Sequence, residues 1–273
     1  MKQVDQKEYD KEYFTTDGGC GSAEVWETYK GKKVDKRLQK SVKLAQIRSG
    51  ERILDYGCGR GEMLVQSAQH GAYIWGIDYA SDAISLAEEA RSACDMETQS
   101  RIKIALQTSK ILPFSDNTFD MVYFLDVIEH LYQEEVDQAL TEIFRVLKPG
   151  GRIILHTYPN KKYFEIGYKY YTKHIYHILS KILFEPFLKR KIRYDDDPRI
   201  PYDKIMHVNE QTLASVKSNL VRAKFVINKA YLSDLFLLKS PIGIFRYLLL
   251  TPSLLPFLKD IFANNIWAVG IKK

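Results

Sequence analysis

A glycine-rich turn over residues 57–61 constrains the fold of this chain more than any other feature. Two apolar residues lead to Asp55, and three glycines then follow at alternate positions: Gly57, Gly59 and Gly61. An amphipathic stretch begins directly after them, so the order predicts a strand, a tight loop and a helix. Glycine accepts positive φ and lets a ligand approach bare backbone, while the free N–H groups at the start of a helix favour an anionic group.

Dinucleotide-binding folds also use a glycine loop, so its spacing and surroundings matter. The spacing here is G-x-G-x-G, and Glu62 occupies the place where G-x-G-x-x-G has its last glycine. A second apolar strand, 72–77, ends in Asp78, 21 residues after Gly57. A carboxylate there can accept hydrogen bonds from both hydroxyls of a ribose. A nucleoside-containing ligand is therefore expected, and the spacing disfavours the NAD-dependent oxidoreductase and the ordinary strand–turn–helix corner that remain as alternatives.

Together, the acidic residues and glycines of this region resemble the cofactor site of class I S-adenosylmethionine (SAM)-dependent methyltransferases. Later segments extend the resemblance to the small-molecule enzymes that include the ubiquinone and menaquinone C-methyltransferases. They are the turn Leu112-Pro113-Phe114, the pair Phe119-Asp120, the ending Glu129-His130-Leu131 and the turn 147–151. The resemblance implies a transferase with SAM as cofactor, acting in small-molecule biosynthesis.

The resemblance also implies roles for individual residues. The loop would hold the amino-acid end of the cofactor, Asp78 the ribose, and Tyr79 would stack on the nucleoside. Many members have an Asp near the adenine where this chain has Thr108 followed by Ser109, so a hydroxyl and a backbone N–H would replace the carboxylate. The expected cofactor-binding residues are Asp55, Gly57, Cys58, Gly59, Gly61, Asp78, Tyr79, Thr108, Ser109, Asp126 and Val127, the last two lining the wall that faces the methyl group.

Strands and helices alternate over residues 51–157, which predicts an α/β fold with a parallel, doubly wound sheet. In such sheets ligands bind at the carboxyl ends of the strands, where the residues above all fall. The resemblance implies a Rossmann-like seven-stranded sheet of order 3-2-1-4-5-7-6, with the last strand antiparallel and helical insertions after strands 5 and 6. Ser81 and Asn209 are expected to cap the helices 82–93 and 209–220, and the fifth strand is expected over 152–157.

We divide the chain into four parts. Residues 1–50 form an N-terminal lid and helix, 51–160 a SAM-binding core, 161–206 an aromatic and basic helical insertion that acts as a substrate cap, and 207–273 the completion of the sheet, with an apolar hairpin at 235–258. Tyr13 and Phe14 are expected to fold over the cofactor, the alternative being a poorly ordered arm. For the insertion, the alternative is an amphipathic cover with a solvated basic face.

Charge is divided unevenly along the chain. Residues 1–160 have 20 Lys and Arg against 25 Asp and Glu, a net of −5, whereas residues 161–273 have 20 against 9, a net of +11. The C-terminal part therefore favours an acidic substrate, an anionic lipid surface or nucleic acid.

Three cysteines without a C-x-x-C pair argue against a disulfide framework and fit a reducing, cytoplasmic compartment. We find no signal core and no spanning run of about 18 apolar residues.

Chemistry at the acceptor is less constrained. If the acceptor is a hydroxyl, a base should take its proton, and His130 and His207 are the candidates because both are expected near the carboxyl ends of strands. For each of these two histidines, the alternative is a purely structural role. Tyr158 is assigned to the substrate side. No His/Asp/Glu set shows metal-ligand spacing, so no metal is expected.

The aromatic, basic insertion favours O- or C-methylation of a small or amphipathic acceptor, such as a sugar, a lipid-linked molecule, or a polyketide-like or quinone-like ring. Peripheral membrane contact is one expectation for the same segment. The alternatives are a non-catalytic methyltransferase-fold subunit that activates a partner, and an RNA methyltransferase. Nucleic acid is disfavoured because no RNA-binding module and no Asn-Pro-Pro-Tyr motif is present. The sequence leaves the oligomeric state open.

Overall fold

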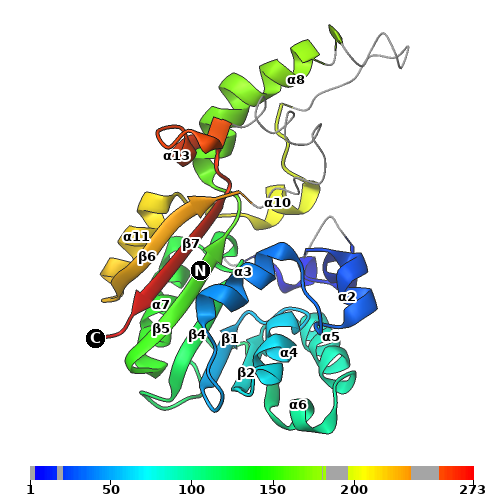
Figure 1. The fold of residues 1–273 in the computed structure, drawn as a ribbon, viewed down its shortest axis with the longest axis vertical. Helices are drawn as coiled ribbons and strands as arrows, with labels where there is room; N and C mark the ends of the chain where they lie inside the picture. Colours follow the sequence, from blue (N-terminus) through cyan, green and yellow to red (C-terminus); the bar gives the residue numbers. More distant parts are fainter. Residues whose placement is uncertain (1–3, 17–20, 180, 183–195, 235–251) are drawn as a thin grey trace.

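The computed structural model describes residues 4–16, 21–179, 181–182, 196–234 and 252–273. Its centre is a seven-stranded sheet with the order β3-β2-β1-β4-β5-β7-β6 (Figure 1). The first five strands pair in parallel, and β7 runs antiparallel to both β5 and β6. The predicted strand order and the antiparallel last strand are confirmed.

The strands are between 5 and 11 residues long, and β5 is the longest. Their bounds are β1 Arg52–Tyr56, β2 Tyr73–Asp78, β3 Ile102–Leu106, β4 Phe119–Leu125, β5 Leu147–Thr157, β6 Val226–Ser233 and β7 Asn265–Ile271. β4 is buried along nearly its whole length, as expected of a parallel strand covered on both faces. β5 starts before the predicted Arg152, because Leu147 already pairs with Phe119 and an irregularity then shifts the register.

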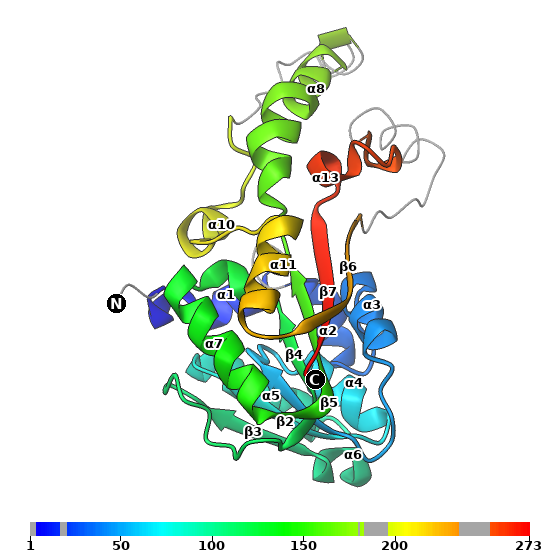
Figure 2. The ribbon, with the colours of Figure 1, turned by 90° about the vertical axis from the view of Figure 1, so that its left-hand side faces the viewer.

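Helices cover both faces of the sheet, and Figure 2 shows the two layers on opposite sides. One layer packs against β1, β2 and β4 and contains α3 (Lys36–Ala45), α4 (Glu62–Gln69) and α5 (Ser81–Ser92), with the short α6 (Met96–Ser100) beside them. The other contains α7 (Gln133–Val146) and α11 (Leu213–Arg222). Each layer has its own apolar core, so this sheet is doubly wound as predicted.

Additional short elements surround the carboxyl ends of the strands. Before the sheet lie η1 (Gln6–Glu8), α1 (Lys11–Thr15) and α2 (Ala23–Tyr29), and η2 (Ile128–His130) follows β4. The insertion after β5 consists of the π-helix η3 (Tyr163–Thr172), α8 (Lys173–Leu179) and α10 (Pro201–Met206), and that after β6 ends in η5 (Pro252–Leu254) and α13 (Lys259–Phe262). Both insertions are thus helical in their described parts, and α8 extends away from the sheet (Figures 1 and 2).

Two parts of the predicted cap fall outside the described residues. They are the basic run 188–193 and most of the apolar hairpin 235–258, of which only 252–258 is described. Within the described part of the chain, no helix is both long and apolar enough to cross a membrane.

Both predicted helix caps are wrong, for a local reason at Ser81 and through a tertiary contact at Asn209. α5 already begins at Ser81, and the Ala80 N–H before it donates to the Asp78 carboxylate at 3.0 Å. α11 begins later than expected and is capped by Thr212, whose hydroxyl accepts from the Ser215 N–H at 3.0 Å. The Asn209 amide instead donates to the Leu131 carbonyl at 3.0 Å, joining this segment to η2.

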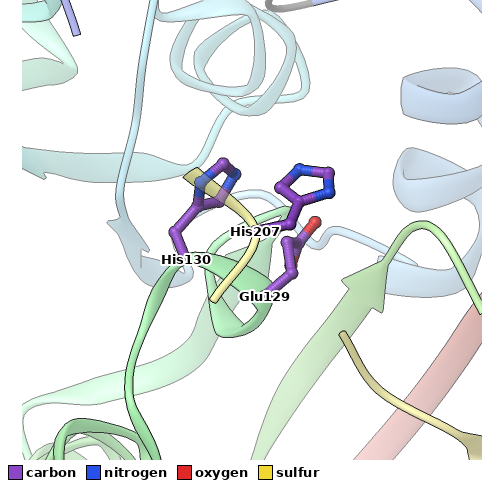
Figure 3. Close-up of side chains that lie close together, drawn as sticks. All are labelled: Glu129, His130 and His207. Atoms are coloured by element: carbon purple, nitrogen blue, oxygen red, sulfur yellow. The ribbon is translucent and has the colours of Figure 1, made fainter. Parts of the chain in front are cut away.

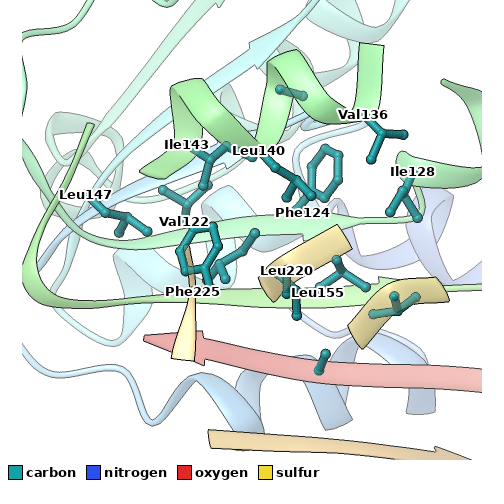
Figure 4. Close-up of a cluster of buried hydrophobic side chains, with 14 of the residues drawn as sticks. Val122, Phe124, Ile128, Val136, Leu140, Ile143, Leu147, Leu155, Leu220 and Phe225 are labelled. Carbon is teal, nitrogen blue, oxygen red and sulfur yellow. The ribbon is translucent and has the colours of Figure 1, made fainter. Parts of the chain in front are cut away.

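The α7 side of the sheet should tolerate truncation poorly. Leu140 is fully buried in the cluster drawn in Figure 4, between α7 and the strands beneath it. We expect Leu140→Ala to lower the free energy of unfolding by about 2–5 kcal/mol, because it removes buried methyl groups and leaves a cavity. Urea denaturation would measure this. The exposed neighbour Thr141→Ala is the control and should change stability by less than about 0.5 kcal/mol; equal effects would contradict the packing shown here.

Candidate active site

A cavity of about 1130 Å³ lies at the carboxyl ends of the parallel strands. Asp55 from β1, Asp78 from β2 and Leu125 from β4 all line it. So do all the other predicted site residues except Gly61: Tyr13, Phe14, Gly57, Cys58, Gly59, Tyr79, Thr108, Ser109, Asp126, Val127, His130, Tyr158 and His207. The structure therefore brings into one space residues that the sequence separates by almost 200 positions.

The glycine loop follows β1 and has little free space. Gly57 has φ +78°, and a Cβ added there would lie 2.5 Å from Cγ2 of Val127. The Gly59 N–H donates to the Asp78 carboxylate at 3.0 Å. Gly61 has φ +82° and lies outside the cavity lining, where an added Cβ would come within 3.0 Å of the Ala87 backbone on α5. Gly61 thus allows close packing of α4 on α5, and the other two glycines shape the cavity wall.

Two buried carboxyl groups face this loop. Burial raises the pKa of Asp55 to about 8, and the neighbouring carboxylates of Asp78 and Glu62 raise it further in the same direction. Burial also raises the pKa of Asp78, although the N–H groups of Ala80 and Gly59 act against it. Because desolvation and like charge both penalise the ionised form, a bound cation would favour ionisation of Asp55. This end of the cavity therefore suits a ligand with positive charge.

The N-terminal segment closes over the glycine loop through Arg60, which the sequence analysis missed. Arg60 is 2% exposed; its Nη1 donates to the Phe14 carbonyl at 2.9 Å, and its own carbonyl accepts from the Trp26 indole at 3.2 Å. A methyl group on Gly59 would lie 3.9 Å from the Phe14 ring. An arginine between two loop glycines was the available sequence signal. The predicted placement of Tyr13 and Phe14 next to the cofactor loop agrees with this arrangement.

Tyr9 is a second residue that the sequence analysis missed. Its ring makes edge contacts with Tyr79, Tyr13 and His130, at centroid distances of 5.1, 5.4 and 5.7 Å. Burial raises the pKa of Tyr9 above its ordinary value, so the phenol is protonated at neutral pH. Tyr9 thus connects the N-terminal segment to both the loop after β2 and the histidine after β4.

The segment after β3 forms the wall where adenine is expected. The Gln107 side chain donates to the carbonyls of Ser109 and Ile111 at 2.9 and 3.0 Å, and the Ile111 N–H donates to the Ser109 hydroxyl at 3.2 Å. Thr108 and Ser109 both line the cavity. Gln107 therefore shapes the turn that presents these two residues.

Asp126 is held at the end of β4 in a charged network. It has φ +54°, its carboxylate pairs with Arg37 from α3, and it accepts a hydrogen bond from Nδ1 of His156 at 2.6 Å. Burial and the charge of Arg37 hold the pKa of His156 well below its usual range, so this imidazole is neutral. The side chain of Asp126 is therefore fixed by partners from α3 and β5, which its place in the sequence did not reveal.

Glu129, His130 and His207 form a compact cluster on another wall of the cavity, and Figure 3 shows them close together. The two imidazoles contact edge to face with centroids 4.8 Å apart. Burial lowers the pKa of His130 to about 3 and that of His207 to about 4, and raises the pKa of Glu129 to about 7. One ligand atom of each residue lies within 4.8 Å of those of the others. Because 77 positions separate the two histidines, ligand spacing along the sequence could not indicate this cluster.

Sequence comparison relates the central part of the chain to known enzymes. Residues 54–155 match the family described as a methyltransferase domain. The chain is 30% identical over 139 residues to phosphoethanolamine N-methyltransferase 2 of Caenorhabditis elegans, covering 50% of this chain and 30% of that protein. It is 28% identical over 160 residues to the ubiquinone/menaquinone biosynthesis C-methyltransferase UbiE of Geobacter sulfurreducens, covering 56% and 60%. The chain thus spans less than two thirds of the length of these relatives.

Solved structures agree at the level of the fold. A SAM-dependent methyltransferase of Methanosarcina mazei superimposes with a TM-score of 0.55 at 19% identity, covering 88% of this chain and 98% of that one. Phosphoethanolamine N-methyltransferase 2 of Haemonchus contortus, in complex with SAM, gives 0.56 at 17% identity, covering 98% and 56%. The family match identifies residues 54–155 as a methyltransferase domain, and the sheet order gives it the fold of class I SAM-dependent methyltransferases. Within that class, the core of this chain resembles the quinone C-methyltransferases.

The raised pKa of Asp55 predicts how stability depends on pH. Between its ordinary pKa near 4 and about 8, the folded protein keeps a proton that the unfolded chain releases, so stability is lost as pH rises through this window. Asp55→Asn removes the effect. We expect the free energy of unfolding of wild type to fall relative to this variant by up to about 1.4 kcal/mol per pH unit, measured in urea at pH 5.5 and 8. The exposed Glu134→Gln is the control; parallel pH profiles for wild type and Asp55→Asn would refute the prediction.

Proposed function

We propose that this protein binds SAM in the half of the cavity next to the glycine loop and transfers its methyl group to a small or amphipathic acceptor in the other half. The observation that carries the proposal is the single continuous cavity, which reaches from Gly57 and Asp78 to the histidine cluster. Its volume of about 1130 Å³ exceeds the roughly 300–1000 Å³ of a site for one drug-sized molecule. Two molecules side by side fit this space better than one.

In the donor half, the residues fit the parts of SAM. The cofactor supplies a methyl group on a positively charged sulfonium. The bare backbone of Gly57, Cys58 and Gly59 would bind its amino-acid end, and the buried carboxyl of Asp55 would compensate its positive charge. Asp78 would accept hydrogen bonds from the ribose. Tyr79, Thr108 and Ser109 would enclose the adenine, the last two with a hydroxyl and a backbone N–H. Asp126 and Val127 would border the methyl group.

The acceptor half has an aromatic wall. Tyr158, Tyr163 and Phe164 line it, and the Arg199 guanidinium lies 4.3 Å from the centre of the Phe164 ring. Such a wall favours a ring or chain with apolar surface, as in a quinone-like, polyketide-like or lipid-linked acceptor. His130 and His207 are neutral at pH 7, so each has a lone pair that could accept a hydrogen bond from an acceptor hydroxyl, although their lowered pKa values make them weak bases. The protein's main contribution would be to hold donor and acceptor in line.

If the acceptor is lipid-linked, the proposed function also implies contact with a membrane surface. A lipid-linked acceptor would bring segments 161–206 and 235–258 to an anionic surface, and vesicle sedimentation that is lost at high salt would support this. A non-catalytic subunit that activates a partner would bind SAM or nothing without turnover. An RNA methyltransferase would label RNA from radioactive SAM and leave small acceptors unlabelled.

Titration calorimetry with SAM tests the donor site. Wild type should bind in the micromolar range, and Asp78→Ala should weaken binding by about 10- to 100-fold because it removes charge-assisted hydrogen bonds. Asp82→Ala, at the start of α5 and outside the cavity lining, is the control.

The bound cation should lower the pKa of Asp55, so at pH 7 wild type should release up to one proton on binding, and Asp55→Asn should release less. Buffers of different ionisation enthalpy measure this proton, and the absence of any heat with SAM would count against the proposed function.

The aromatic lid formed by Tyr13 and Phe14 gives a separate test. Phe14 is 4% exposed and lies beside the glycine loop, so Phe14→Ala should raise the Kd for SAM by about tenfold, or about 1.4 kcal/mol, because it removes the ring that would cover the bound cofactor. Fluorescence or calorimetric titration measures this change. Tyr29→Ala, a partly exposed aromatic of α2, should leave the Kd unchanged; equal affinity of wild type and Phe14→Ala would place the segment outside cofactor binding.

A further inference from the structure

The cluster of Glu129, His130 and His207 has a feature that a pair of packed histidines does not need. The Nδ1 atoms of both imidazoles are shielded from solvent and have no hydrogen-bond partner among the described residues. A buried polar atom without a partner is unfavourable. Two such atoms on neighbouring rings that line a cavity indicate that something else occupies the space between them.

The other ring nitrogens face acceptor groups. The His130 ring bonds the backbone carbonyl of Met206, and Nε2 of His207 lies 3.5 Å from the carboxylate of Asp203, which is an ion-pair distance. A carbonyl or carboxylate that accepts from one ring nitrogen fixes the proton there and leaves a lone pair on the other. Metal-binding histidines in proteins are held in this way by carbonyl and carboxylate partners. Both unpaired Nδ1 atoms therefore present lone pairs.

Glu129 supplies the third group and is held in the same manner. Its carboxylate accepts from the Thr157 hydroxyl at 2.9 Å and from the Tyr158 N–H at 3.4 Å, one bond to each oxygen. The residue is 1% exposed. Each carboxylate oxygen has more than one lone pair, so these bonds orient the group without saturating it.

We propose that Glu129, His130 and His207 bind one divalent transition-metal cation of the Zn²⁺ or Fe²⁺ type, with open coordination positions toward the cavity. Two imidazoles and one carboxylate form a common ligand set for such ions when a position is left for water or substrate. Imidazole ligands disfavour Mg²⁺ and Ca²⁺, which prefer oxygen. The ligand atoms lie within 4.8 Å of one another, and bonds of about 2.1 Å require the set to contract by roughly an ångström.

The site also indicates what it would bind from the acceptor. All three residues line the same cavity as the donor site, so an oxygen-bearing acceptor such as a hydroxyl or phenol would reach the open positions. This step rests on the proposed methyl transfer, since a cation lowers the pKa of an oxygen bound to it. A nitrogen lone pair that binds a metal is not available as a base, so the cation would replace the predicted base role of the two histidines.

Equilibrium dialysis against Zn²⁺ tests the site without SAM or acceptor, using chelator-treated protein without a polyhistidine tag. We expect one Zn²⁺ per chain, no comparable binding of Mg²⁺, and affinity lowered at least tenfold in Glu129→Gln and His207→Gln. His70→Gln, which removes an exposed histidine at the end of α4, is the matched control and should bind like wild type. Circular dichroism of each variant checks the fold.

Substitution of Co²⁺ for Zn²⁺ keeps the test decisive if a variant misfolds. Wild type should show visible d–d bands that Zn²⁺ abolishes, and no thiolate charge-transfer band, which would indicate binding at Cys58 instead. Wild type that binds neither ion, or the two variants binding like wild type, would overturn the proposal. Because no step of the assay uses SAM, a failure here leaves the proposed methyl transfer standing, and a failure of SAM binding leaves the metal site standing.

Discussion

The close approach of two chain segments at Gly57 is the constraint on which the cavity depends. The loop after β1 and Val127 after β4 meet so tightly that even a methyl group on Gly57 would lie 2.5 Å from the valine side chain. The neighbouring β2 is tied to the same loop, because Asp78 accepts from the Gly59 N–H. Three parallel strands thus end at one fixed edge. The donor half of the cavity follows from that edge, and its backbone stays accessible because glycine adds no side chain.

Around this edge, burial changes the protonation of acidic side chains. Asp55 is fully enclosed next to other carboxylates, which keeps it largely protonated until positive charge arrives. Arg60 lies in the same loop but points its charge toward the N-terminal segment and Glu62. Arg60 thus connects the loop to the N-terminal segment, whereas Asp55 lies in β1 just before the loop and is the carboxyl group whose ionisation a bound cation would favour.

Local patterns predicted the framework well, because their causes are local. Apolar runs that end in Asp55 and Asp78, and glycines at alternate positions, indicate strand ends and a tight loop without knowledge of the fold. One helix cap failed because a distant partner decides the outcome: the Asn209 amide bonds the carbonyl of Leu131, 78 positions away. The failure at Ser81 is local, since α5 begins one residue earlier than expected and Asp78 accepts from the Ala80 N–H. Like the Asn209 contact, the histidine cluster escaped detection because the fold alone brings its members together.

The two halves of the cavity differ in the kind of evidence that supports them. The donor half is built from backbone and from residues within about 70 positions, so sequence, structure and relatives describe it consistently. The acceptor half combines Glu129 and His130, which lie within the matched segment 54–155, with side chains after residue 155, such as Phe164 and His207, which lie outside it. The relatives that the chain matches over about half of its length have N-, O- and C-methyltransferase names, so their names do not point to one acceptor. The acceptor must therefore be inferred from this chain's own wall, where aromatic rings would select for shape and where, among the described residues, the Nδ1 atoms of His130 and His207 have no hydrogen-bond partner.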